Sequence, residues 1–113
     1  MNSDKILFKL HAEMCNSFAH PIRLETVHHL KTLGRELSFG EIADLIGVSK
    51  STLARHLSIM VTNGILVQRK EGVNVYYRIA SGKITTACGL IREVLIDRLK
   101  SNIELVNNLK QSK

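Results

Sequence analysis

Apolar residues recur every three or four positions along most of this 113-residue chain, which is the spacing of helices that bury one side. The pattern predicts five helices, two of them short and the last about 30 residues long, well above the usual helix length. The expected ranges are 3–16, 21–33, 38–46, 49–62 and 81–110. Polar residues over 107–113 make the end of the last helix an expected frayed tail. The chain length fits a single domain over 1–113.

The period changes to that of strands over residues 65–79. Apolar and β-branched residues fill 65–67 and 73–79, and Glu71-Gly72 between them supplies a turn, so we expect a two-stranded antiparallel hairpin. An isolated hairpin is marginal in water and must pack on the helices. The predicted fold class is therefore mainly α, with about five helices and one β-hairpin.

Residues 38–63, SFGEIADLIGVSKSTLARHLSIMVTN, indicate two short helices with a tight break between them. Ser38 is a good N-cap, and Glu41 three residues later closes a capping box. Gly47 can adopt the left-handed conformation that ends a helix, and Ser49 then caps the second helix. This arrangement is typical of a helix-turn-helix, and the alternative is an ordinary helical hairpin with a polar outer face.

The second of these helices has two unlike sides. The apolar side consists of Leu53, Leu57, Met60 and Val61, and the opposite side carries Lys50, Ser51, Arg55 and His56. A helix packed by its apolar stripe, with hydrogen-bonding side chains near its start, suits the major groove of DNA. The basic hairpin that follows, with the tip RKEGVN, is then the wing of a winged helix, placed to contact phosphates or the neighbouring minor groove. The alternative for the hairpin is a structural role with a soluble turn.

The positive charge of the chain, +6 with a pI near 9.6, is concentrated in the same region. Residues 49–79 hold five cations and one acid, a net charge of +4. Such a concentration favours a polyanion, although a solvated basic face would also produce exposed cations. Aromatic residues make up only 4% of the chain, which argues against a stacking platform for single strands. Without a Gly-rich phosphate loop, a carboxylate pair or a metal-ligand cluster, we do not expect an enzyme.

Nothing in the sequence indicates export or a membrane partner. No apolar run approaches the roughly 18 residues of a membrane span, and the first 14 residues are interrupted by charges, so we expect a cytoplasmic protein. Cys15 and Cys88 are far apart, match no CxxC pattern, and are expected to stay reduced.

The apolar stripe of the predicted last helix is longer than a small domain can cover. A second subunit is the simplest cover, with the first and last helices forming a homodimer interface. The alternative is a helix that wraps around its own domain.

The segments FAHPIRLETVHHL and LSFGEIADLIGVSKSTLARHLSIMVTNGILVQRKEGVNVYYRI resemble the arsenic-repressor (ArsR/SmtB-type) family of winged-helix transcription regulators, over about residues 5–100. The resemblance implies a homodimer, joined through its first and last helices, that binds a palindromic operator in double-stranded DNA. Members usually repress until a metal ion, a metalloid, a reactive sulfur species or an oxidant releases them. The positions that the resemblance assigns to DNA binding are Lys50, Ser51, Thr52, Arg55 and His56 in the major groove, and Arg69, Lys70 and Asn74 in the wing.

The inducer sites of that family do not carry over. The stretch GEIADLIG lacks the cysteine pair of arsenic-binding members, and the last helix lacks the histidine of zinc-sensing members. In persulfide-sensing members a cysteine stands where this chain has His28, and Cys88 lies too early for the second one.

Cys15 and Cys88 remain, on two helices that we expect to pack together. Two such thiols could form a disulfide or bind a soft metal or metalloid ion, with His11 as a third ligand or as a group that lowers the thiol pKa. No other cofactor is indicated. The sequence thus predicts a homodimeric, sequence-specific repressor released by a thiol-reactive or metal signal. The alternatives are a redox-insensitive DNA-binding protein with structural cysteines, and a winged helix used for protein contacts.

Overall fold

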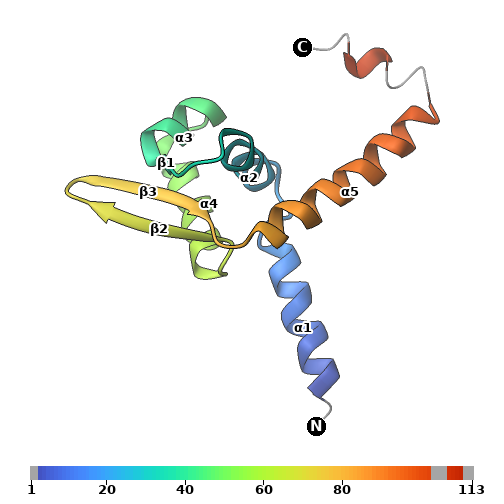
Figure 1. Cartoon of the computed structure of the whole chain (residues 1–113), viewed down its shortest axis with the longest axis horizontal. Helices are drawn as coiled ribbons and strands as arrows, with labels where there is room; N and C mark the ends of the chain where they lie inside the picture. The colour runs from blue at the N-terminus through green and yellow to red at the C-terminus, as the bar shows by residue number, and fades with distance from the viewer. Residues whose placement is uncertain (1–2, 103–106, 111–113) are drawn as a thin grey trace.

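The computed structural model describes residues 3–102 and 107–110 (Figure 1). Its labelled elements are α1 (Ser3–Asn16), α2 (Pro21–Leu33), β1 (Leu37–Ser38), α3 (Phe39–Ile46), α4 (Lys50–Thr62), β2 (Leu66–Glu71), β3 (Asn74–Ile79) and α5 (Gly82–Lys100). A separate helical turn spans 107–110. The mainly α winged-helix fold is therefore confirmed.

The capping residues predicted from the sequence lie at both ends of α3 and at the start of α4. The Glu41 N–H donates to Ser38 Oγ at 3.1 Å, and the Ser38 N–H donates to Glu41 Oε1 at 3.0 Å, which completes the capping box. Gly47 ends α3 with a φ of 76°, a conformation that costs glycine little. The Thr52 N–H then donates to Ser49 Oγ at 3.2 Å at the start of α4. These contacts confirm the expected break between α3 and α4.

The sheet has one more strand than expected. β2 and β3 form the predicted antiparallel hairpin, and β1 pairs with the other edge of β3, with Leu37 opposite Tyr77, in the order β1-β3-β2. No strand was expected between the helices predicted over 21–33 and 38–46, because a two-residue strand is too short to show an alternating pattern. This strand attaches the base of the hairpin to the segment just before α3.

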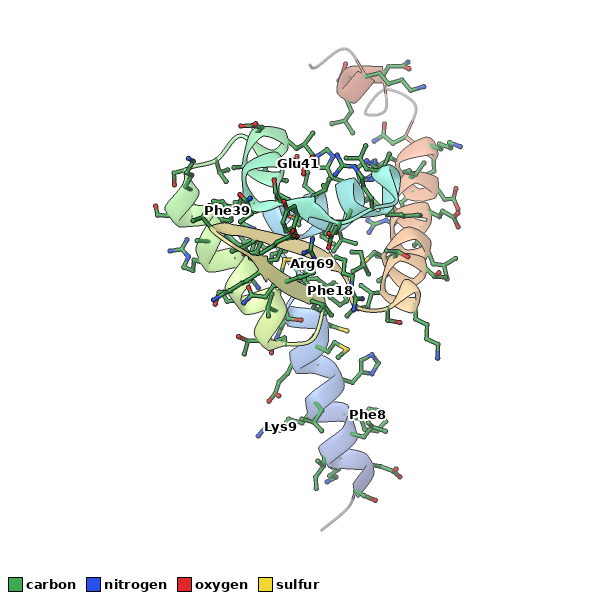
Figure 2. The ribbon with its side chains drawn as sticks, turned by 60° about the vertical axis from the view of Figure 1, so that its left-hand side comes forward. Phe8, Lys9, Phe18, Phe39, Glu41 and Arg69 are labelled. Atoms are coloured by element: carbon green, nitrogen blue, oxygen red, sulfur yellow. The ribbon has the colours of Figure 1, made fainter. Side chains whose placement is uncertain are left out.

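The core lies between α2, α3, α4 and the base of the sheet, and Figure 2 shows side chains crowded there. Leu53, Leu57 and Met60 are fully buried on the inner side of α4. Burial of side chains of this size contributes about 1.5–3 kcal/mol each, so α4 is held firmly by that side.

The first and last helices project from this core (Figure 1). None of the 14 residues of α1 is buried, and Phe8 and Lys9 stand out from it in Figure 2. None of the 19 residues of α5 is buried either. Within the described ranges, no helix combines the length and the apolar character needed to cross a membrane.

The expectation of one final helix of about 30 residues is wrong. α5 ends at Lys100, where the Ser101 hydroxyl donates to the Arg98 carbonyl oxygen at 2.6 Å. Serine hydroxyls often compete in this way with the regular hydrogen bonds of a helix. Ile103 and Val106 of the expected stripe lie outside the described residues, as do 111–113 of the expected tail, while 107–110 are helical.

Candidate nucleic-acid interface

The outer side of α4 is polar and open. Lys50, Ser51 and Arg55 are exposed, as expected. Thr52 is half-buried, and its hydroxyl accepts a hydrogen bond from Ser49 Oγ at 2.8 Å, so it takes part in the helix cap. Ser58, which was not among the predicted DNA-binding residues, is exposed too and lies three residues after Arg55 on the same side of the helix. The outer side therefore offers hydroxyl donors and two cations over two turns.

The expectation that His56 faces the major groove is wrong. Its side chain is 5% exposed and lies on the inner side of α4, between Leu53 and Met60 in the helical repeat. His56 Nδ1 accepts a hydrogen bond from Arg23 Nε at 3.0 Å. The sequence signal was present, because position 56 follows Leu53 by three residues and precedes Met60 by four.

Arg23, which the sequence analysis did not single out, joins three elements. Its Nη1 donates to the Ser17 carbonyl oxygen at 3.2 Å, just beyond α1, while its Nε reaches His56 on α4. The His20 ring lies 4.3 Å from that of His56, and His20 Nδ1 accepts from the Ile22 N–H at 3.1 Å as the N-cap of α2. His20 thus caps α2 and packs against His56.

In the wing, Arg69 is not a free cation. Its guanidinium forms ion pairs with Glu36 and Glu71, and it lies 4.5 Å from the centre of the Tyr76 ring. These carboxylates raise the pKa of Arg69, and the guanidinium in turn lowers the pKa of Glu36. Lys70 is exposed and belongs to none of the ion pairs formed among the described residues. Of the two cations near the hairpin tip, Lys70 is therefore the one left available to a partner.

Asn74, the third residue expected in the wing, is exposed at the start of β3. It pairs with Glu71 across the hairpin, next to the turn at Gly72. Asn74 and Lys70 thus lie together at the hairpin tip.

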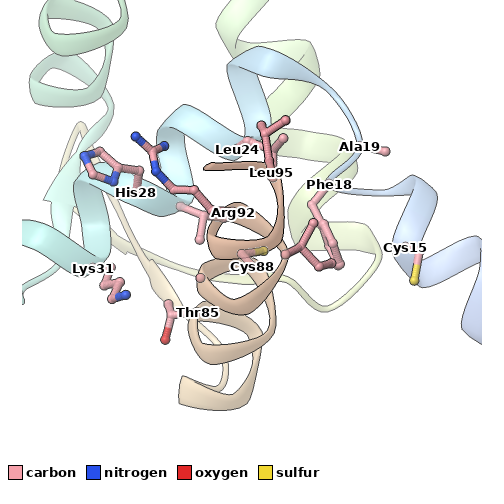
Figure 3. A pocket seen from close by; sticks show the side chains of 13 residues that line it. Cys15, Phe18, Ala19, Leu24, His28, Lys31, Thr85, Cys88, Arg92 and Leu95 are labelled. Atoms are coloured by element: carbon pink, nitrogen blue, oxygen red, sulfur yellow. The ribbon is translucent and has the colours of Figure 1, made fainter. Parts of the chain in front are cut away.

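The two cysteines line one groove of about 420 Å³ between the end of α1, α2 and α5 (Figure 3). Both thiols are free; Cys15 is exposed and Cys88 is half-buried. Burial, and secondarily the nearby Cys15, raise the pKa of the Cys88 thiol. In the view of Figure 3 the Phe18 ring lies between the two thiols.

The expected third ligand, His11, is absent from the lining of this groove. Over the described residues, no three His, Cys, Asp or Glu side chains are grouped so that they could hold a metal ion. One chain therefore does not bring His11 to both thiols.

Comparison with known proteins places this geometry among DNA-binding regulators. Residues 18–69, from just before α2 into β2, match the family model described as a helix-turn-helix domain. The chain is 29% identical over 105 residues to the HTH-type transcriptional regulator Rv0081 of Mycobacterium tuberculosis, covering 92% of this chain and 90% of that protein. The crystal structure of Rv0081 superposes with a TM-score of 0.74 at 30% identity, over 86% of this chain and 96% of that one.

Two further proteins are similar. The transcriptional repressor PagR of Bacillus anthracis is 28% identical over 83 residues, covering 74% of this chain and 82% of PagR. The solution structure of Mb0332 from Mycobacterium bovis, described as a homodimeric winged helix-turn-helix DNA-binding domain of a possible ArsR-family regulator, superposes with a TM-score of 0.76. It covers 88% of this chain and 90% of its own, and at 24% identity it shows the shared fold.

Proposed function

The chain belongs to the helix-turn-helix transcriptional regulators, and we propose that it is an ArsR-type repressor that binds a palindromic operator in double-stranded DNA as a homodimer. The outer side of α4 carries this proposal, because Lys50, Ser51 and Arg55 project from a helix whose other side is fixed in the core. We assign Arg55 to base edges, Lys50 and Ser51 to the operator backbone, and Thr52 to the cap that presents them. Lys70 and Asn74 contact the flanking phosphates from the wing.

The exposed apolar sides of α1 and α5 support the homodimer. Leu7 and Leu10 on α1 are 63% and 54% exposed, and Ile91 and Val94 on α5 are 65% and 62% exposed. Contiguous apolar surface of this kind marks an interaction site, and a two-fold axis through it would present two α4 helices to one duplex. The homodimeric description of Mb0332 agrees with this arrangement.

The test is selection of a duplex from a random pool by the purified protein at pH 7.5. We expect a palindromic sequence, bound by two chains and at least 10³-fold more tightly than a scrambled duplex of the same composition. Equal affinity for both duplexes would leave only nonspecific binding. No binding to either would favour the alternative, a winged helix used for protein contacts.

We also propose a cytoplasmic protein whose repression is released through its thiols. The support is that Cys15 and Cys88 line one groove between helices that belong to the proposed dimer interface. Two thiols that lose two protons and two electrons to a peroxide form a disulfide, and the peroxide is reduced to water. Such a bond would change how α1 lies against α5, and with it the separation of the two α4 helices.

This second proposal is tested by treating the dimer with hydrogen peroxide and measuring operator affinity and free thiols together. We expect a loss of affinity that dithiothreitol reverses and that Cys15→Ser and Cys88→Ser each abolish. Unchanged affinity after complete oxidation would identify both as packing residues. If thiolates of two protomers instead bind a soft metal or metalloid ion, the ion should lower operator affinity without an oxidant. That loss of affinity should likewise require both cysteines.

A further inference from the structure

A polar cluster packs against the inner side of α4, the proposed recognition helix. This side is turned away from the proposed DNA surface. His56 is its centre, almost fully buried, and Arg23 Nε donates to His56 Nδ1 at 3.0 Å. The same guanidinium donates to the Ser17 carbonyl oxygen at 3.2 Å. Arg23 therefore connects the end of α1, which belongs to the proposed dimer interface, with the middle of α4.

The hydrogen bond exists only for neutral His56. Nδ1 accepts from Arg23 with its lone pair, so the imidazole proton of the neutral ring is on Nε2. Protonation of Nδ1 would turn this acceptor into a donor opposite another donor, and would place a second positive charge against the guanidinium. We call the position of α4 in this structure the seated form. It is compatible only with a neutral His56 ring.

We propose that Arg23 and His56 position the recognition helix through this hydrogen bond, and that acidification disrupts it and lowers the ability of the protein to discriminate its operator from other DNA. The inference rests on the proposed function, since it concerns the orientation of the helix assigned to base contacts. Arg55, the residue assigned to base edges, directly precedes His56 on α4. A movement of the helix at His56 therefore also moves Arg55.

The charges around His56 support the direction of this effect. Burial lowers the pKa of His56 first, and His20, Arg23 and Arg55 lower it further. The titratable groups that face it are thus His20 before α2, Arg23 on α2 and Arg55 on α4 itself, and each of them opposes a positive charge on the ring.

The sign follows from linkage. A displaced α4 would expose His56, whose pKa would return toward about 6.5, so the displaced form binds protons more readily than the seated form. The seated form is fully favoured above that value. The fraction of molecules in the seated form falls as the pH drops below 6.5. This decrease ends once the pH is below the lowered pKa that His56 has in the seated form.

The experiment measures affinity for the selected duplex and for its scrambled counterpart from pH 8.0 to pH 5.0 at constant ionic strength, by fluorescence anisotropy. Acid should tighten nonspecific binding, since histidines gain charge, so the informative quantity is the ratio of the two dissociation constants. Linkage shifts the equilibrium between the seated and displaced forms by at most about tenfold for each unit by which the pKa of seated His56 lies below 6.5, so we expect the ratio to fall by up to that factor. A ratio that stays constant down to pH 5.0 overturns the proposal.

Three variants separate positioning from general stability. His56→Gln keeps an acceptor for Arg23 without a titrating ring, and its ratio should not change with pH. Arg23→Gln keeps a donor without the charge, so the acid midpoint should move to higher pH, toward 6.5. His28→Gln on the exposed side of α2 is the matched control and should keep the wild-type profile. A wild-type profile in both His56→Gln and Arg23→Gln overturns the proposal.

A measurement without variants covers the case in which a substitution prevents folding. The imidazole signals of the full-length protein, followed by NMR through the same pH range, should show His56 titrating below the ordinary histidine value of about 6.5. A His56 that titrates at or above 6.5 overturns the proposal even if DNA binding is normal. If the protein selects no duplex at pH 7.5, the proposed function fails, while the NMR titration still tests the charge state of His56.

Discussion

Arg69 and Lys70, the two cations near the tip of the wing, should respond differently to substitution, because only Arg69 forms ion pairs among the described residues. Lys70 is exposed and joins no ion pair among the described residues, whereas Arg69 is paired with Glu36 and Glu71. We therefore predict that Lys70→Ala removes a phosphate contact from each wing of the dimer. Arg69→Ala should instead loosen the wing without removing a phosphate contact.

The magnitude follows from counterion release. Each phosphate neutralised on duplex DNA contributes about 0.9 to the slope of log affinity against log salt concentration, so two lysines contribute about 1.8. Between 50 and 200 mM salt, the wild-type protein should lose about tenfold more affinity than Lys70→Ala. Fluorescence anisotropy over a salt series measures this difference directly.

Lys100→Ala supplies the matched control, since it removes an equal charge at the end of α5, on the opposite side of the molecule from the hairpin (Figure 1). Its salt slope should equal that of the wild type. An unchanged slope in Lys70→Ala would show that the wing does not contact phosphates. An equal decrease in Arg69→Ala would show that Arg69 exchanges its carboxylates for phosphates on binding.

Four shorter predictions concern other parts of the chain. Arg55→Ala should reduce the free-energy difference between selected and scrambled duplexes by about 1–3 kcal/mol, and an unchanged difference would refute its assignment to base edges. Leu10→Asp places a charge on the exposed apolar side of α1 and should shift the protein to single subunits in analytical ultracentrifugation; a persistent dimer would exclude α1 from the interface. Ser38→Ala removes the acceptor of the capping box and should lower the free energy of unfolding by about 1 kcal/mol in urea titrations, where no change would contradict the cap. Exposed Cys15 should react with iodoacetamide before half-buried Cys88, whose pKa is raised, and mass spectrometry of the modified peptides checks the order.

The parts of the fold that were predictable depend on local signals. Ser38, Gly47 and Ser49 act through their own backbone or through residues two or three positions away, so the sequence contains the whole interaction. β1 was not predictable in this way, because two residues become a strand only when the edge of β3 reaches them. The end of α5 was not predictable either, because the apolar spacing of the sequence continues beyond Lys100, where Ser101 bonds the Arg98 carbonyl oxygen.

The candidate site was predictable in outline and wrong in one position. Lys50 and Arg55 lie outward as the pattern of polar residues indicated. His56 was assigned to the same face because histidine is polar, although its spacing from Leu53 matched the inner side. The role of Arg69 could not be foreseen, since Glu36 lies 33 positions away in the sequence and meets it only through the sheet.

The first helix has one more consequence, for proteolysis. It contains 14 residues and buries none of them against its own chain, and an isolated helix of that length is barely stable in water. The surface that covers α1 must therefore also stabilise its helical conformation. Trypsin, which cuts after Lys5 and Lys9, should cleave α1 quickly in dilute protein and slowly in concentrated protein. The cleavage rate would therefore report the fraction of subunits that have dimerised.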